Sequence, residues 1–293
     1  MRILSIQSAV SYGHVGNSAA VFPLQRLGHE VMPVATVCFS NHTGYGDWQG
    51  VMFNGEQVRD IVAGIDKRGA LADTELIISG YQGGSSIGDA ILDTVAKTKA
   101  RNPRAVYSCD PVLGNENSGC FVSPEVQELI RDRVIQHADI ITPNQFELGF
   151  LTGRELNTLA DTFDAIKEIQ RIGPQTVLVT SVNRADAQSQ TLEMLAVNQS
   201  EAWLISTPRL PGKINGSGDV TQALFAAHLS SGKSLRQALE LTTASVFELL
   251  AKTISAGSKE LLLIEAQEAY VAPARSFTAR QIDRSSGSEL NPA

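Results

Sequence analysis

Cysteine is scarce in this chain. Only three cysteines occur among 293 residues, at Cys38, Cys109 and Cys120. No Cys-x-x-Cys pair and no matching histidine spacing is present, so a structural zinc site is not expected. An odd, widely spaced set also argues against a disulfide framework. We therefore expect free thiols and a protein of the reducing cytoplasm.

Long apolar runs and an excess of basic residues are also missing. No stretch reaches the ~18 apolar residues of a transmembrane helix, and the N-terminal residues lack the features of a signal peptide. The chain carries 24 Lys plus Arg against 31 Asp plus Glu, a formal net charge of −7. Because nucleic acids and anionic membranes are bound by clustered cations, neither is an expected partner. The 43% of hydrophobic residues, by contrast, can build a sizeable core and exclude disorder for most of the chain.

Short apolar segments alternate with helical patterns along the chain. The predicted strands are residues 3–6, 31–37, 76–78, 105–108, 139–141, 176–179, 192–197 and 201–205, the last two as a hairpin; the predicted helices are 17–27, 87–99, one starting at 123–125, 219–230 and 235–253. This order, with strands rich in β-branched and aliphatic residues, predicts an α/β fold whose mostly parallel sheet is flanked by helices on both faces. No repeat or linker divides residues 1–284, so we expect a single domain, and the composition of 285–293 is typical of a solvated terminus.

A glycine-rich turn directly before a predicted helix is the most informative motif. Gly216, Ser217 and Gly218 are small enough for the backbone to approach a ligand, and the first N–H groups of the helix that follows would face it. This combination predicts an anion-binding site. The adjacent Asp219 is suited either to accepting a proton or to capping the helix, and spacing alone leaves both open.

Two further acidic residues follow predicted strands. Asp110 comes directly after Cys109, and Glu147 lies shortly after the strand that ends at residue 141. Carboxylate oxygens are the ligands that Mg²⁺ prefers, often together with water and phosphate. Each residue alone is equally compatible with a turn or with a helix start. Because ligands bind beyond the carboxyl ends of parallel strands, Asp110, Glu147 and Asp219 together indicate a metal and phosphate site.

Several motifs resemble those of one known family, over nearly the whole chain. They are Ser-x-x-x-x-Gly-His-x-Gly-Asn-Ser-Ala-Ala at 8–20, Phe-Ser-Asn-His-Thr at 39–43, Ser-Gly-Tyr at 79–81, Cys-Asp-Pro-Val at 109–112, Thr-Pro-Asn-x-x-Glu at 142–147 and Gly-Ser-Gly-Asp at 216–219. The sequence thereby resembles the pyridoxal kinases of the ribokinase-like superfamily. The resemblance implies a three-layer ribokinase-like fold and ATP-dependent phosphorylation of the 5′-hydroxymethyl group of pyridoxal, a salvage reaction that gives pyridoxal 5′-phosphate.

The same resemblance implies roles for individual residues. Asp219 would take the proton of the attacking alcohol, and the amides of Gly216, Ser217 and Gly218 would hold the developing charge. Asp110 and Glu147 would organise Mg²⁺, and family members usually act as homodimers and use a monovalent cation. The implied ATP-binding residues are Asp110, Thr142, Asn144, Glu147, Thr180, Thr207, Pro208, Arg209 and Leu210, and the implied pyridoxal-binding residues are Ser8, Val15, His42, Thr43, Gly44, Tyr81 and Asp219. Thr180 departs from the lysine of many bacterial members, which removes an ammonium group from the phosphate side.

Alternatives to this function remain open at this point. A hydroxymethylpyrimidine kinase of the same superfamily acts on another hydroxymethylated heteroaromatic ring. Residues 84–88 fit the Gly-x-Ser-x-Gly elbow of serine hydrolases, although only His137 and His228 follow as possible partners for Ser86. A pyridoxal-binding protein without turnover is a third possibility. A sugar kinase is disfavoured, because no acidic residue that could hold sugar hydroxyls precedes Glu30.

Overall fold

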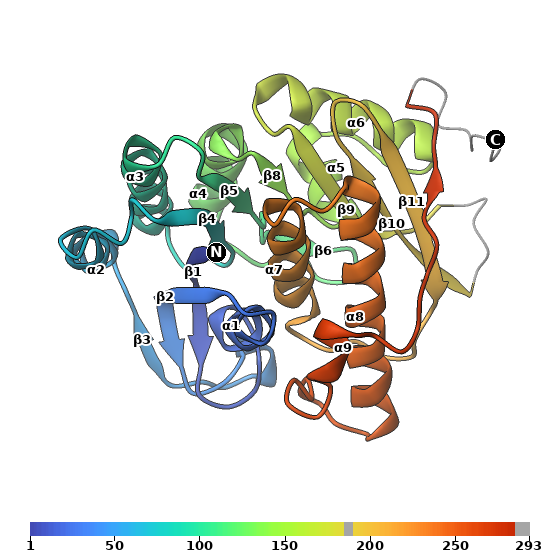
Figure 1. The fold of residues 1–293 in the computed structure, drawn as a ribbon, viewed down its shortest axis with the longest axis horizontal. Helices are drawn as coiled ribbons and strands as arrows, with labels where there is room; N and C mark the ends of the chain where they lie inside the picture. The colour runs from blue at the N-terminus through green and yellow to red at the C-terminus, as the bar shows by residue number, and fades with distance from the viewer. Residues whose placement is uncertain (185–189, 285–293) are drawn as a thin grey trace.

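A ten-stranded sheet is the centre of the computed structural model, which describes residues 1–184 and 190–284 (Figure 1). The terminus predicted at 285–293 lies outside these residues. The strand order across the sheet is β12 (Arg280–Gln281), β11 (Ala202–Pro208), β10 (Thr191–Val197), β9 (Thr176–Val182), β8 (Ile140–Ile141), β5 (Val106–Cys109), β4 (Thr74–Ser79), β1 (Arg2–Val10), β2 (Glu30–Phe39) and β3 (Gly50–Met52). The strands from β9 to β2 are parallel, whereas the outer strands at both edges pair antiparallel. The predicted mostly parallel sheet is confirmed.

Helices cover both faces of the sheet, because alternate side chains of the central strands point to opposite sides. In β9, for example, Val177 and Val179 join one buried cluster and Leu178 joins the other. One face carries α1 (Asn17–Arg26), α7 (Ser217–Ser230), α8 (Leu235–Ser255) and α9 (Glu268–Val271), and the other carries α2 (Gly55–Asp66), α3 (Ser85–Arg101), α4 (Pro124–Leu129), α5 (Gln145–Thr152) and α6 (Leu159–Ile172). These three layers confirm the predicted α/β architecture.

Some elements differ from the sequence expectation. Strand β1 continues to Val10, so Ser8 lies within the strand rather than beyond its end. Residues 114–120 form a small hairpin of β6 (Gly114–Asn115) and β7 (Gly119–Cys120), and α4 continues into a π-helical turn η2 (Ile130–Val134) and a short helix η3 (Ile135–His137). The edge strands β3 and β12 and the helices α2, α5 and α6 were not predicted. Short edge strands lack the buried, alternating pattern by which strands are recognised.

The expectation of free thiols agrees with the structure. Cys38, Cys109 and Cys120 are free, and Cys109 is buried. Gly232 follows the end of α7 with a positive φ and Ser234 caps α8, so a short turn connects these two helices. Within residues 1–184 and 190–284, no helix is both long enough and apolar enough to cross a membrane.

Candidate active site

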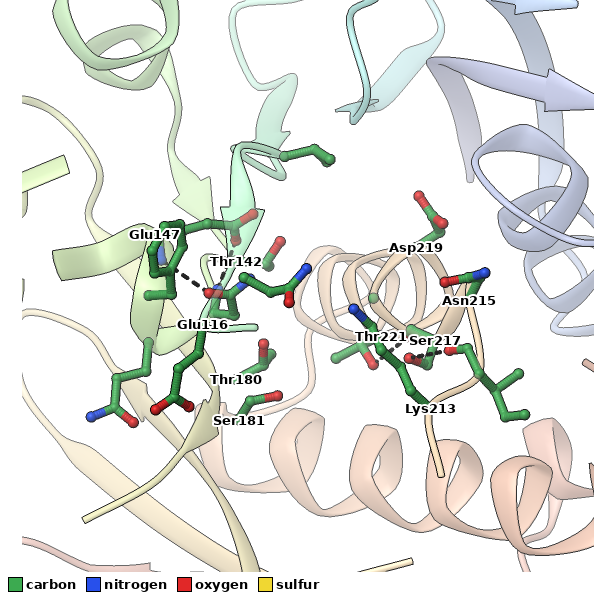
Figure 2. A pocket seen from close by; sticks show the side chains of 18 of the residues that line it. Glu116, Thr142, Glu147, Thr180, Ser181, Lys213, Asn215, Ser217, Asp219 and Thr221 are labelled. Atoms are coloured by element: carbon green, nitrogen blue, oxygen red, sulfur yellow. Dashed lines mark hydrogen bonds between the residues drawn. The ribbon is translucent and has the colours of Figure 1, made fainter. Parts of the chain in front are cut away.

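A cavity of about 1570 Å³ lies at the carboxyl ends of the parallel strands (Figure 2). This is where ligands bind in open α/β sheets. All of the candidate residues line it: Ser8, Val15, His42, Thr43, Gly44, Tyr81, Asp110, Thr142, Asn144, Glu147, Thr180, Thr207, Pro208, Arg209, Leu210, Gly216, Ser217, Gly218 and Asp219. Their separation along the chain, from β1 to α7, shows that the fold brings distant strand ends to one place.

The turn before α7 leaves backbone donors free to face the cavity. Gly216 precedes the helix with φ of 85°, and a Cβ there would lie 1.9 Å from the carbonyl oxygen of His14, so only glycine fits. No side chain caps this helix start. The N–H groups of Ser217 and Gly218 therefore keep the anion-binding capacity of a helix N-terminus.

Asp219 is the third residue of α7, so it is not the helix cap. Its side chain is partly open to the cavity but otherwise surrounded by protein atoms, and this desolvation raises its pKa to about 6. The backbone N–H groups of Gly16 and of Asp219 itself oppose the shift in its pKa. A carboxylate with a pKa just below neutral is ionised at pH 7 yet basic enough to share a proton in a transition state.

Asp110 lies across the same turn, directly after β5. A Cβ on Gly218 would be 3.9 Å from Asp110 Oδ2, and the aspartate is 8% exposed. Desolvation raises its pKa well above the ordinary value, and the charges of Glu147 and Asp219 raise it further. No hydrogen bond to its carboxylate is found among the residues that the structure describes. A buried carboxyl of this kind is suited to a bound cation, which would stabilise its ionised form.

Glu147 is engaged by the protein backbone. Its Oε1 accepts the N–H groups of Leu113 and Gly114 at 3.0 and 3.3 Å, and its Oε2 accepts that of Asn144 at 2.9 Å. Burial raises its pKa to about 7, against the effect of these hydrogen bonds. The side chain thus joins the β6–β7 hairpin to the start of α5, where Asn144 forms the other half of a capping box. Glu147 can contribute to cation binding through its charge, but its contacts are structural.

The half of the cavity near β9–β11 combines hydroxyl groups with an apolar wall. Thr142 Oγ1 is buried without a hydrogen-bond partner among the described residues, and Thr180 lies on β9, which pairs with the strand that precedes Thr142. Phe247 and Leu250 of α8 supply part of the wall. A buried hydroxyl without a partner costs free energy, and a ligand oxygen at this position would satisfy it.

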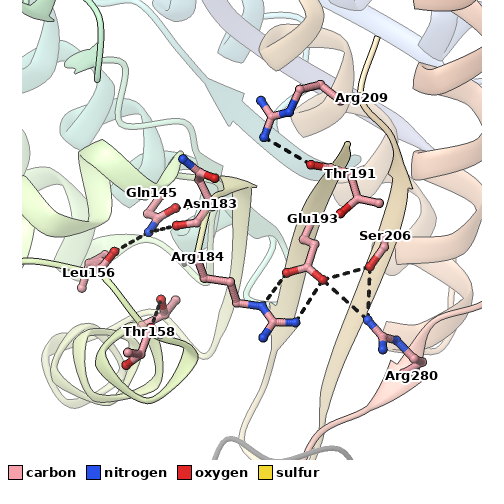
Figure 3. Close-up of polar contacts among 11 residues, drawn as sticks. Gln145, Leu156, Thr158, Asn183, Arg184, Thr191, Glu193, Ser206, Arg209 and Arg280 are labelled. Carbon is pink, nitrogen blue, oxygen red and sulfur yellow. Dashed lines mark hydrogen bonds and ion pairs between the residues drawn. The ribbon is translucent and has the colours of Figure 1, made fainter. Parts of the chain in front are cut away.

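Polar contacts fix the strands behind this half (Figure 3). The buried carboxylate of Glu193 accepts two hydrogen bonds from Arg184 and also pairs with Arg280 and Ser206. Gln145 donates to the carbonyl oxygens of Leu156 and Asn183. These contacts connect β10, β11 and β12 to one another, and they connect α5 to the segment after β9. They therefore hold in place the strands that carry Thr207–Leu210.

The opposite half is bordered by β1, the segment after β4 and the turn η1 (Thr43–Tyr45). Ser8 is buried, and burial raises the pKa of the half-buried Tyr81. His42 caps η1, and its Nδ1 accepts the N–H of Gly44 at 3.0 Å and lies 3.3 Å from Asn215 Nδ2. Burial lowers the pKa of His42, which keeps its ring neutral and able to accept this bond.

Some residues at the site had not been singled out from the sequence. Asn215 precedes the glycine turn and connects it to His42, and Glu116 extends from the β6–β7 hairpin toward the cavity. Gln222 is fully buried in α7 and donates to the carbonyl oxygens of Ser79 and Ser108, at the ends of β4 and β5. A polar residue one turn after Asp219 in an apolar helix was a usable signal for Gln222.

The hydrolase alternative is not supported by the geometry. Ser86 lies in the first turn of α3, and its hydroxyl accepts the N–H of Gly55 at 3.1 Å. His228 is buried in α7, where desolvation lowers its pKa to about 4. Within residues 1–184 and 190–284, no hydrogen bond joins Ser86 to a histidine, so a serine–histidine pair is not formed.

Known proteins are similar to this chain in sequence and in structure, over most or nearly all of its length. The profile of the phosphomethylpyrimidine kinase family matches residues 83–263. A protein of Leifsonia xyli subsp. xyli named pyridoxal kinase PdxY is 55% identical over 282 residues, which cover 96% of this chain and 100% of that protein. The pyridoxal kinase PdxY of Corynebacterium diphtheriae is also 55% identical, with coverage of 96% and 100%. The pyridoxal kinase of Leishmania donovani, solved in complex with ADP and pyridoxamine, superposes with a TM-score of 0.90 at 28% identity, over 96% of this chain and 99% of that one.

Proposed function

Since this chain belongs to the pyridoxal kinase family, we propose that it transfers the γ-phosphoryl group of ATP to the 5′-hydroxymethyl group of pyridoxal. The resemblance of its motifs to that family is confirmed by the comparisons. The observation that carries the assignment is that Asp219 and the free N–H groups at the start of α7 belong to one turn. A carboxylate with a pKa of about 6 lies beside an anion site, inside a cavity that is large enough for two substrates.

Asp219 acts on the alcohol. Its ionised carboxylate accepts the proton of the hydroxyl group as the oxygen attacks the γ-phosphorus of ATP, and the bond from the γ-phosphorus to the bridging oxygen of ADP breaks. The N–H of Gly16 holds the carboxylate in place. The products are then ADP, pyridoxal 5′-phosphate and a proton on Asp219, which is released to solvent.

The amides of Gly216, Ser217 and Gly218 stabilise charge. The transferred phosphoryl group carries its negative charge on three peripheral oxygens, and the first N–H groups of α7, which have no partner within the helix, belong to the same turn as Asp219. Because Gly216 has no side chain, this backbone can approach the group closely. The donors are held by the helix before the reaction starts, so they need no reorganisation during it.

The carboxyl groups fit a magnesium requirement. Asp110 is buried with a raised pKa and with no donor reaching its carboxylate among the described residues, and Glu147 adds a second carboxyl group. Asp110 would hold Mg²⁺ together with water and phosphate oxygens, with Glu147 acting through its charge. An ion bound there would neutralise part of the charge of the phosphates. A monovalent cation beside Mg²⁺ belongs to the same proposal, on the resemblance alone.

The two halves of the cavity suit the two substrates. Ser8, Val15, His42, Thr43, Gly44 and Tyr81 border the side near Asp219 and would hold the pyridine ring, with Tyr81 packing against it. Thr142, Asn144, Thr180 and Thr207–Leu210 border the other side and would hold ATP. A flat aromatic ring between an aromatic side chain and hydroxyl groups is a common mode of recognition.

The wider proposal concerns organisation. Residues 1–284 form one domain, which is supported by a single sheet running from β3 to β12. The protein acts in the cytoplasm as a homodimer. Val51 and Met52, 56% and 50% exposed on the edge strand β3, are apolar side chains of the kind that a second copy would cover.

The second candidate function is that of a hydroxymethylpyrimidine kinase. The match to the phosphomethylpyrimidine kinase profile supports it. The test compares kcat/KM for pyridoxal and for hydroxymethylpyrimidine with ATP and Mg²⁺. We expect pyridoxal to be preferred by at least about two orders of magnitude, because ring contacts worth ~3 kcal/mol separate such substrates. Equal values, or a preference for the pyrimidine, would overturn the assignment.

A further inference from the structure

Glu260 lies outside the cavity but contacts two segments that border its pyridoxal side. It follows α8 and is half-buried. Its Oε2 accepts the backbone N–H of His14 at 2.9 Å, and its Oε1 accepts the hydroxyl group of Tyr45 at 2.6 Å. One carboxylate therefore joins the loop after β1 to the end of η1, although these partners are 246 and 215 residues away in sequence.

The loop held through His14 reaches the catalytic turn. Gly13 has φ of +86°, and a Cβ on it would lie 2.2 Å from Glu260 Oε2, so the loop backbone packs directly on the carboxylate. On its other side, the carbonyl oxygen of His14 packs against Gly216. Further along the same loop, the N–H of Gly16 faces the carboxylate of Asp219. A shift of this loop would therefore move both the turn at Gly216 and the N–H group of Gly16 that donates to Asp219.

The segment held through Tyr45 carries residues of the pyridoxal side. Tyr45 is the last residue of η1, which also contains Thr43 and Gly44 and is capped by His42. The side chain of Tyr45 is 41% exposed, and its hydrogen bond to Glu260 is the main cause that raises its pKa to about 12. With His42 placed beside Asn215, η1 is anchored at both ends.

Glu260 is itself held in a defined position. Ser258 Oγ donates to the carbonyl oxygen of Glu260 at 2.6 Å and accepts its N–H at 3.2 Å. The next residue, Leu261, is 1% exposed, and its Cδ1 would be 3.0 Å from a Cβ on Gly216. A carboxylate on so constrained a backbone can determine the position of the loops that bind it.

We propose that Glu260 is a positioning residue for the pyridoxal half of the site, holding the loop after β1 and η1 in place around Asp219. This inference rests on the proposed function, since it assigns the effect to the acceptor substrate. Loss of the carboxylate then weakens pyridoxal binding and slows transfer. ATP binding is affected less, because most of its side of the cavity is built from β9–β11, α5, α8 and the β6–β7 hairpin, which Glu260 does not contact.

The experiment compares Glu260→Gln, Glu260→Ala and Tyr45→Phe with the control Glu265→Gln in the full-length enzyme. Glutamine offers one acceptor oxygen for two donors, whereas Glu265 is exposed on the same segment and its change alters charge equally. For Glu260→Gln, we expect the KM for pyridoxal to rise about tenfold with a fall in kcat, because hydrogen bonds to a charged group are commonly worth that much. The KM for ATP, and all constants of the control, should stay within about twofold of the unaltered enzyme.

Coupling between the two contacts separates positioning from general damage. If Tyr45 acts through Glu260, the double variant Glu260→Ala with Tyr45→Phe is no worse than Glu260→Ala alone. Melting temperatures identify any variant that does not fold, and Tyr45→Phe, at an exposed hydroxyl, keeps the test available in that case. Unchanged pyridoxal constants in these variants, or equal changes in the KM for ATP and for pyridoxal, overturn the inference. Absence of pyridoxal phosphorylation by the unaltered enzyme would overturn the proposed function, and this inference with it.

Discussion

Asp219→Asn is expected to make the ligand-free protein more stable while it removes the proposed catalytic base. Burial raises the pKa of Asp219 from an ordinary 3.8 to about 6, which by linkage corresponds to about 3 kcal/mol once the carboxyl is ionised in both states. The side chain is partly open to the cavity, where water screens its charge. We therefore expect the substitution to raise the free energy of unfolding by about 1–2 kcal/mol. Asparagine keeps an acceptor oxygen for the N–H of Gly16 and carries no charge.

The sign of this effect depends on pH. Below about pH 4 the carboxyl is protonated in the folded and unfolded states, so charge contributes no difference between variant and unaltered protein. Between about pH 4 and 6 the folded protein keeps a proton that the unfolded chain releases. The stability of the unaltered protein therefore falls, relative to that of the variant, as pH rises through this window, and the full difference is present above it.

Unfolding measured across this pH range, without ATP and Mg²⁺, tests the reasoning. At pH 7.5 the melting temperature of Asp219→Asn should exceed that of the unaltered protein by roughly 2–4 °C, and the difference should vanish near pH 4. Glu116→Gln is the matched control, because Glu116 lines the same cavity but is exposed. A difference for Asp219→Asn that stays constant with pH would refute the claim that desolvation perturbs this carboxyl.

Three further predictions concern the metal and nucleotide side. Asp110→Asn should raise the Mg²⁺ concentration for half-maximal activity at least about tenfold in a titration at saturating substrates, and an unchanged value would remove Asp110 from the metal site. Glu147→Gln leaves one oxygen for three backbone donors, so the KM for ATP should rise while that for pyridoxal stays constant; equal changes in steady-state kinetics would contradict this. Thr142→Val removes a buried hydroxyl that has no partner in the described part of the chain, so urea unfolding should show unchanged or higher stability together with a higher KM for ATP, and a loss of more than about 1 kcal/mol would contradict the assignment.

The sheet could be predicted because its central strands are continuous apolar segments. Strands such as β4 and β9 are buried on both faces, and their β-branched residues and bordering polar turns mark them within a few residues. Part of the cavity lining could be predicted for the same reason, since Asp110 and Thr142 follow strand ends. The edge strand β3 could not be identified in this way, because its three residues are exposed and alternate with nothing buried.

Contacts between distant segments were beyond the reach of local patterns. Nothing near Glu260 in sequence shows that it meets His14 and Tyr45, because only the path of the chain after α8 brings them together. The hydrogen bonds of Glu147 likewise depend on where the β6–β7 hairpin lies. For Asp219, the motif predicted the neighbouring amides. Its position as the third residue of α7 was not predicted, because it depends on Gly216 being the N-cap of the helix.

The central claim is that Asp219 deprotonates the pyridoxal alcohol beside a turn that receives the phosphoryl charge. The most direct test is the single-turnover rate of phosphoryl transfer from ATP to bound pyridoxal in Asp219→Asn, with the pyridoxal Kd measured on the same preparation. The account predicts a Kd within a few-fold of that of the unaltered enzyme and a transfer rate lower by about 10²–10⁴. A transfer rate close to that of the unaltered enzyme, at equal occupancy by pyridoxal, would contradict it.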